Sequence, residues 1–131
     1  MWSDPIADML NRIRNGVRSR AREVKIPASR LKANIAEVLR QEGYIAGYDR
    51  IDDTRQGLLR VVLKYSPQGE SVITQIRRYS KTGARRYRPV GKLPRVLNGL
   101  GIAVVSTNQG VLSDRQCRER RIGGEVICTV Y

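Results

Sequence analysis

Residues 102–105, an apolar run rich in β-branched side chains, most constrain how this chain can fold. Such a run is typical of a strand buried in a sheet. Five small or polar residues, 106–110, follow it directly, and we expect them to end the strand. Their hydroxyl and amide groups both donate and accept hydrogen bonds, which suits a base edge, a ribose hydroxyl or a phosphate oxygen. The alternative interpretation is an ordinary polar turn.

The charge of the chain favours a polyanionic partner. Lysine and arginine together number 25 against 12 acidic residues, so the formal net charge is +13 at pH 7. This excess is self-repulsive unless a polyanion neutralises it. Arginine predominates over lysine. Because guanidinium groups bind phosphate with two hydrogen bonds and stack on bases, this composition favours RNA.

Helical and strand patterns alternate, which predicts an α+β fold with two small domains, residues 1–65 and 66–131. In the first domain we expect the order helix, strand, helix, strand, strand. Asp4 and Pro5 begin the first helix, which Asn15 and Gly16 should end, and Ser29 caps the second helix. The remaining expected features are a strand over 23–27, a second helix with apolar positions Leu31, Ile35, Val38 and Leu39 that closes at Gly43, and strands over 44–51 and 58–65 joined by a hairpin.

The second domain is expected to be β-rich with short helices, and it follows a turn-rich connector over 66–70. Ser113 and Gln116 form a capping-box pattern, which predicts a helix over about 114–120. The other expected elements are a strand over 71–79, a turn over 80–83, an extended segment over 85–89, one or two helical turns over 93–98 that stop at Gly99, the strand over 102–105, and a final strand over 125–131.

The densest basic and aromatic segment, residues 77–88, is a second candidate site. It holds six basic residues and two tyrosines. Guanidinium groups bind phosphates, and tyrosine rings stack on bases. We therefore expect this segment to position a nucleic acid that residues 106–110 read. The alternative is a solvent-facing hairpin whose tyrosines pack on the core.

The sequence carries no motif of a known enzyme chemistry. It has no histidine, no phosphate-binding loop, no dinucleotide fingerprint and no nucleophile–base pair. Asp52 and Asp53 fall in a predicted hairpin turn, where acids are common. Cys117 and Cys128 lack metal-ligand spacing, so we expect free thiols and no metal or cofactor. No apolar run approaches the length of a membrane span, and the first residues lack the pattern of a secretory signal.

Several sequence blocks agree with one known pattern, in order along the whole chain. The blocks are residues 4–15 (DPIADMLNRIRN), residues 93–103 (LPRVLNGLGIA), Ser106-Thr107 with Gly110-Val111 and Ser113-Asp114-Arg115, and Gly123-Gly124-Glu125 with an aromatic residue at the end. Together they resemble the family of the eighth protein of the small ribosomal subunit, in its bacterial type.

This resemblance implies two small α+β domains and a structural, non-catalytic role. It implies direct binding to a helix in the central domain of small-subunit rRNA early in assembly, near the fifth and seventeenth proteins of the subunit, in the cytoplasmic ribosome. Some bacterial members of the family also repress translation of their own operon by binding an mRNA that mimics the rRNA site. No membrane and no small-molecule substrate are implied.

The resemblance also assigns RNA-contacting residues. The main RNA contact of the family maps onto residues 106–110, and Arg85 and Tyr87 match an arginine and a tyrosine of its basic hairpin. From the residues themselves, Gly123-Gly124-Glu125 is expected to be a tight strand entry in which Glu125 orders the loop. The residues expected at the RNA are Ser106, Thr107, Asn108, Gln109, Gly110, Lys81, Arg85, Arg86, Tyr87, Arg88 and Glu125. Three further residues, Arg14, Arg30 and Lys32, are expected to contact only the RNA backbone.

Two positions depart from the family pattern. Asn108 stands where serine is usual, and Gln109 stands where lysine or arginine is usual. Gln109 removes one positive charge, so we expect nearby arginines to compensate or the rRNA to differ slightly. From the residues alone, two other classes stay open: a basic DNA-binding or architectural protein, and an RNA-modifying enzyme. The absence of a helix-turn-helix pattern argues against the first, and the absence of a catalytic constellation argues against the second.

Overall fold

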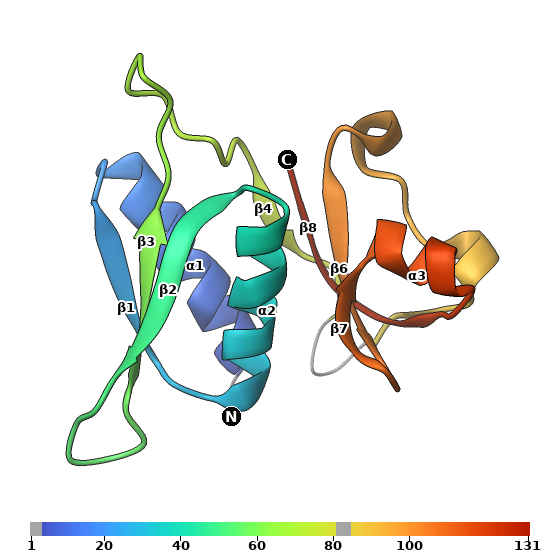
Figure 1. Cartoon of the computed structure of the whole chain (residues 1–131), viewed down its shortest axis with the longest axis horizontal. Helices are drawn as coiled ribbons and strands as arrows, with labels where there is room; N and C mark the ends of the chain where they lie inside the picture. Colours follow the sequence, from blue (N-terminus) through green and yellow to red (C-terminus); the bar gives the residue numbers. More distant parts are fainter. Residues whose placement is uncertain (1–3, 81–84) are drawn as a thin grey trace. The chain divides into compact units, whose positions relative to one another are not determined.

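The structure, a computed structural model, describes residues 4–80 and 85–131. The chain forms two compact units (Figure 1). The first unit is Ile6–Thr74, and the second is Gln75–Tyr131 together with Asp4 and Pro5. Each unit contains an antiparallel sheet and helical segments, so the predicted α+β class is confirmed.

The first unit is a three-stranded sheet with two helices packed on one face (Figure 1). Its elements are α1 (Pro5–Arg18), β1 (Glu23–Pro27), α2 (Arg30–Gln41), β2 (Ile45–Ile51) and β3 (Leu58–Leu63). The sheet order is β1-β3-β2. Along the central strand, Leu59, Val61 and Leu63 are buried, while the residues between them are half-buried. This period of two gives the sheet one face toward the helices and one outer face.

The first helix is longer than predicted, because α1 continues past Asn15-Gly16 to Arg18. Gly16 is a buried residue of this helix rather than its end. A Cβ atom on Gly16 would lie 2.5 Å from Val24 Cγ1 and 3.0 Å from Leu63 Cδ1. The glycine is therefore needed for close packing of the helix on the sheet, and it was wrong to interpret it as a stop signal.

The second helix begins as predicted, with the Ser29 hydroxyl accepting a hydrogen bond from the Lys32 amide at 3.2 Å. One predicted core position is wrong, because Leu31 is 40% exposed. Lys32 is buried in its place, and its ammonium group donates a hydrogen bond to the Pro27 carbonyl at 2.9 Å. A lysine stem can line apolar surface when its charged end finds a partner. The other predicted positions, Ile35, Val38 and Leu39, are buried as expected.

The second unit is a sheet in which β8 pairs with three other strands. Its elements are β4 (Ile76–Arg78), β5 (Tyr87–Arg88), the 3₁₀ turns η1 (Val90–Lys92) and η2 (Val96–Gly99), β6 (Ile102–Thr107), β7 (Gly110–Ser113), α3 (Asp114–Arg120) and β8 (Gly124–Val130). The order is β4-β8-β6-β7, with β5 also paired to β8. The strand β7 was not predicted, and it makes β6 one arm of a hairpin.

Two other predicted elements of this unit are wrong in extent. The strand expected over 71–79 is limited to β4, and Ser71 forms only an isolated bridge with Tyr65. Of the helical turns expected over 93–98, only η2 falls in that range, because the backbone at Leu93 and Arg95 is extended, and η1 precedes the range. Proline at position 94 favours that extended backbone before it.

The predicted helix at 114–120 is confirmed, including its capping box. The Ser113 hydroxyl accepts from the Gln116 amide at 3.2 Å, and the Gln116 side chain accepts from the Ser113 amide at 3.1 Å. This helix covers a core cluster to which the sheet contributes Ala103, Val105 and Val126. The core thereby holds β6 rigid up to its exposed end.

Candidate nucleic-acid interface

The tip of the β6–β7 hairpin is a two-residue turn, Asn108-Gln109. The prediction that all five residues 106–110 break the strand is wrong, because Ser106 and Thr107 belong to β6 and Gly110 begins β7. Gly110 has φ 110°, a conformation that L side chains rarely adopt. The segment is thus a tight hairpin with an exposed amide pair at its tip.

Thr107 holds this turn in shape. Its hydroxyl donates to the Gly110 carbonyl at 2.7 Å and accepts from the Gln109 amide at 3.0 Å. These bonds leave Asn108 and Gln109 exposed at the tip. Thr107 therefore positions the turn, and the two amide side chains beside it face solvent.

Three predicted site residues from three strands lie in one row of the sheet. Ser106 pairs with Glu125 across β6 and β8, and Tyr87 pairs with Glu125 across β5 and β8. Residues directly opposite each other project on the same face of a sheet. Arg85 joins this row, because its Nη1 atom lies 3.0 Å from both carboxylate oxygens of Glu125. The carboxylate thus orients a guanidinium beside Tyr87 and Ser106.

A pocket of about 270 Å³ lies beside this row. Its lining residues are Tyr87, Ser106, Thr107, Asn108, Ile122, Gly123 and Gly124. A Cβ on Gly123 would lie 2.4 Å from the Arg88 carbonyl oxygen, and one on Gly124 would lie 2.3 Å from the Ser106 carbonyl oxygen. The two glycines therefore let β5 and β6 approach the start of β8. Sequence reasoning missed Ile122 and the two glycines as site residues, although adjacent glycines are a signal of close backbone approach.

The basic segment before β5 is anchored by its backbone. The buried Ser80 hydroxyl accepts a hydrogen bond from the Arg86 amide, and the Arg86 carbonyl accepts from the Val126 amide at 2.9 Å. The side chains of Arg85 and Arg86 remain exposed. Lys81 and the rest of the predicted turn after Ser80 lie outside the described residues.

The two tyrosines of the basic segment differ in environment. Tyr87 is 66% exposed, while Tyr79 packs against the core cluster. The alternative in which the tyrosines pack on the core therefore describes Tyr79 only. Tyr87 presents its ring to solvent next to the pocket, where a base or ribose could stack on it.

Arg120 brings a positive charge to the turn. Its Nη1 atom lies 3.4 Å from the Gln109 side-chain oxygen, on an exposed part of α3. The side chain of Gln109 is uncharged, but a guanidinium reaches the same position from the neighbouring helix. The sequence order could not indicate this contact, since eleven positions separate the two residues.

The three residues expected at the RNA backbone all lie in the first unit. Arg30 is exposed, Arg14 is half-buried and donates to the Asn11 side chain, and Lys32 is buried. Burial lowers the pKa of the Lys32 ammonium group, which already donates to Pro27. Of the three, Arg30 is the best placed to meet a phosphate.

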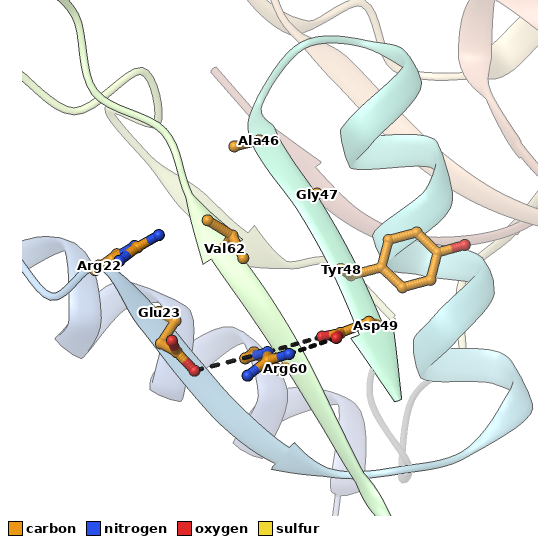
Figure 2. A pocket seen from close by; sticks show the side chains of 8 residues that line it. All are labelled: Arg22, Glu23, Ala46, Gly47, Tyr48, Asp49, Arg60 and Val62. Carbon is orange, nitrogen blue, oxygen red and sulfur yellow. Dashed lines mark hydrogen bonds and ion pairs between the residues drawn. The ribbon is translucent and has the colours of Figure 1, made fainter. Parts of the chain in front are cut away.

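A second hollow, of about 580 Å³, lies on the outer face of the first sheet (Figure 2). Arg60 crosses it, with Nη2 at 2.5 Å and Nε at 2.8 Å from the two carboxylate oxygens of Asp49, and Nε at 3.9 Å from Glu23. The Arg60 hydrogen bonds lower the pKa of Asp49. Two carboxylates, Asp49 and Glu23, border this guanidinium, whereas Arg85 pairs with one carboxylate and is followed by the exposed Arg86. The hollow is therefore less suited to phosphate than the row in the second unit.

The described residues contain no candidate metal site. Among residues 4–80 and 85–131, no three histidine, cysteine or acidic side chains come together in a way that could hold a metal ion. Within the same residues, no helix is both long and apolar enough to cross a membrane. Cys117 and Cys128 are free and buried thiols, as predicted.

Comparison with known proteins gives a consistent result. The sequence profile of a family described as Ribosomal protein S8 matches residues 4–131. The chain is 54% identical over 130 residues to a protein of Anaeromyxobacter sp. (strain Fw109-5), covering 99% of this chain and 98% of the relative. It is 52% identical to a protein of Geobacillus kaustophilus over 100% of this chain and 99% of the relative, and 47% identical to one of Thermodesulfovibrio yellowstonii over the whole of both. Each of these relatives is named small ribosomal subunit protein uS8.

Proposed function

Because the chain belongs to the ribosomal protein S8 family, whose members are structural, non-enzymatic proteins of the small ribosomal subunit, we propose that it binds the central domain of small-subunit rRNA directly. The observation that carries this proposal is the row Ser106–Glu125–Tyr87, which brings a polar hairpin, an oriented arginine and an exposed ring to one face of a sheet. By holding that RNA in its folded shape, the protein would support its assembly.

The arrangement suits an irregular RNA helix. The major groove of A-form RNA is too narrow for side chains, so proteins read its shallow minor groove and any distorted or unpaired bases. The amides of Asn108 and Gln109 can hydrogen-bond ribose hydroxyls and base edges. The ring of Tyr87 can stack on a base beside them. Specificity would therefore come from the turn and from Tyr87.

Affinity would come from the guanidinium groups around the row. Arg85 and Arg86 lie in the segment that leads into β5, Arg88 lies in β5, and each guanidinium can bind a phosphate. Arg120 supplies the charge that Gln109 lacks, which supports compensation by a nearby arginine rather than a changed rRNA. Lys81 and the exposed Arg30 complete the proposed set of phosphate contacts, with Arg14 and the buried Lys32 as weaker candidates.

We also propose that the chain lies in the cytoplasmic ribosome, next to the fifth and seventeenth proteins of the small subunit. A surface that recognises a distorted RNA helix can also recognise an mRNA of similar shape, so repression of its own operon would use the same residues. We further propose that the chain has two independent domains, residues 1–65 and 66–131.

The test is fluorescence or filter binding of the full chain to a fragment of the central rRNA domain. We expect Asn108→Ala and Thr107→Ala each to weaken binding by about 1–3 kcal/mol, the range of a lost specific contact. Gln68→Ala is the matched control, because it truncates another exposed turn amide, in the connector of the first unit. Thr107→Ser retains the hydroxyl, so it should bind nearly as well as the wild type.

Salt and competitor RNA separate specific recognition from charge alone. Arg120→Gln should weaken binding and reduce the slope of log K against log salt by about 0.7–0.9, the contribution of one phosphate contact. In the Arg120→Gln variant, the further substitution Gln109→Lys should partly restore both the affinity and the salt slope. Equal binding to duplex DNA, with no effect of the hairpin variants, would show that the positive surface is unspecific and would overturn the proposal.

A further inference from the structure

The loop that leads into β6 exposes two leucines. Leu97 is 51% exposed, and Leu100, at 80%, is the most exposed large apolar residue in the described part of the chain. Leu97 lies within the η2 turn and Leu100 directly follows it, with Asn98 and Gly99 between them. This turn lies at the N-terminal end of β6 (Figure 1). We call Leu97 and Leu100 the leucine pair. Exposed apolar side chains of this size on a shaped loop indicate a contact surface.

The backbone of this loop is strained. Leu97 has φ 47° and ψ 49°, and Asn98 has φ 53° and ψ 35°. Asparagine tolerates the left-handed region, but leucine rarely adopts it. Strained backbone persists only where the surrounding structure imposes it, and it concentrates at functional surfaces.

The surrounding structure fixes the loop firmly. The Gly101 amide donates to the Val96 carbonyl at 3.0 Å, and the Arg115 side chain donates to the Gly99 carbonyl. A Cβ on Gly101 would lie 2.5 Å from the Val130 carbonyl oxygen, so only glycine allows the loop to enter the sheet here. The leucine pair is therefore presented in a fixed geometry, which reduces the entropy lost when a partner binds.

The charges around the leucine pair are positive. Arg95 is exposed and directly precedes η2, and Arg115 reaches the loop from α3. A partner that buries the pair would thus be complementary if carboxylates bordered its apolar surface. RNA fits less well, because leucine cannot pair with the phosphates and ribose hydroxyls that it would desolvate.

We propose that the leucine pair is a docking site for another protein, one whose surface offers an apolar pocket bordered by acidic side chains. Within the second unit, the pair and the Asn108-Gln109 turn lie at opposite ends of β6. Six strand residues span about 20 Å, so one unit can bind RNA at one end and protein at the other. The proposal rests on the proposed function, since it takes the partner to be a component of the small ribosomal subunit.

Photo-cross-linking tests the identity of the partner. A benzophenone amino acid replaces Leu100 in the full chain, which is then assembled with purified rRNA and the purified set of small-subunit proteins. After irradiation, mass spectrometry identifies the cross-linked segment. We expect a protein segment with apolar residues and neighbouring Asp or Glu. A cross-link to rRNA, or none in particles that contain the chain, would overturn the proposal.

A competition assay measures the contribution of the pair. Wild type and a Leu97→Ser, Leu100→Ser variant compete for incorporation into these particles, and we expect at least a tenfold preference for the wild type, since burying one leucine side chain alone can supply about that factor. Leu31→Ser is the matched control, because it is an exposed leucine on an unstrained helix. Equal incorporation of both chains would contradict docking.

Binding to the isolated rRNA fragment separates the two proposals. The Leu97→Ser, Leu100→Ser variant should bind the fragment as tightly as the wild type, because the hairpin turn is unchanged. If the variant lost fragment binding as well, the pair would be an RNA contact and the docking proposal would fail. If the wild type itself failed to bind the fragment, the proposed function would fail instead.

Discussion

Asp114 is a buried carboxylate whose two oxygens both have partners. It accepts from the Ala103 amide at 3.0 Å and from Arg118 Nη1 at 2.5 Å, and its side chain is 1% exposed. Removing one partner of a buried pair leaves the other charge and a buried amide unsatisfied. We expect Asp114→Ala to lower the free energy of unfolding by about 3 kcal/mol, measured by urea denaturation.

The control for this prediction is Asp8→Ala. Asp8 also pairs with an arginine four residues later, Arg12 at 2.9 Å, but both side chains are about half exposed. Exposed ion pairs contribute about 0–1 kcal/mol, so this variant should unfold close to the wild type. Equal losses for the two variants would show that burial does not decide the contribution of the pair.

The two cysteines should be unreactive in the folded chain. Burial raises the pKa of Cys128 to about 12, and burial also raises the pKa of Cys117. Only the thiolate reacts with iodoacetamide, and neither sulfur is accessible. We expect negligible alkylation at pH 8 without denaturant and complete alkylation in urea, followed by mass spectrometry. Rapid labelling of the native chain would mean that the sheet around β8 opens readily.

At the scale of the element, Gly16 tests how α1 packs on its sheet. Glycine to alanine inside a helix ordinarily stabilises it by about 1 kcal/mol. Here the new Cβ would meet Val24 and Leu63, so we expect Gly16→Ala to destabilise the chain by about 1–3 kcal/mol in urea denaturation. Gly47→Ala in β2 is the control, because nothing lies within 4 Å of its Cβ position. Stabilisation by both variants would refute the packing argument.

The contact between α2 and β2 gives the first unit an acid-sensitive link. Glu37 accepts hydrogen bonds from Arg40, Gln41 and Tyr48, and the bond from Arg40 contributes most to lowering the pKa of Glu37 from 4.5 to about 2. Its stabilisation is therefore present above pH 4.5 and is lost as the pH falls toward 2. The urea midpoint of the wild type should approach that of Glu37→Gln across this interval. A constant difference would exclude the ionised carboxylate as the cause.

The elements could be predicted from local patterns where local chemistry decides them. The caps at Ser29 and Ser113, the strand Glu23–Pro27 and the helix Asp114–Arg120 follow from hydrogen bonding and spacing within a few residues. Errors occurred where tertiary contacts decide instead. Gly16 continues a helix because it packs against a sheet, and β7 forms because β6 offers it a neighbour.

At the scale of the whole molecule, the candidate site illustrates the same limit. The residue types at 85–88 and 106–110 indicated a polar surface with positive charge, but the row through Glu125 depends on the sheet order β4-β8-β6-β7. Strand order is a non-local property, and no short motif contains it. The contact of Arg120 with Gln109 likewise requires α3 to lie beside the hairpin. Whether these residues bind RNA stays a prediction.

The net charge of the molecule should make its stability rise with salt. Salt screens two opposing effects. Attraction within the ion pairs stabilises the fold, and repulsion among the 13 excess positive charges destabilises it. The attraction within each pair is weak, because exposed ion pairs such as Arg12–Asp8 contribute at most about 1 kcal/mol. The repulsion acts among all the excess charges, and it is screened as the Debye length falls from about 30 Å at 0.01 M to about 8 Å at 0.15 M.

We therefore expect the thermal midpoint to rise by several degrees between 0.01 M and 0.15 M sodium chloride, since each kcal/mol shifts the midpoint of a chain of this size by roughly 3–5 °C. A variant with Arg55→Gln and Lys64→Gln, both exposed and outside the proposed RNA surface, should begin at a higher midpoint in low salt and respond less. A fall of the midpoint with salt would mean that the ion pairs outweigh the repulsion. In that case the excess charge would not by itself require a polyanion for the folded chain to be stable.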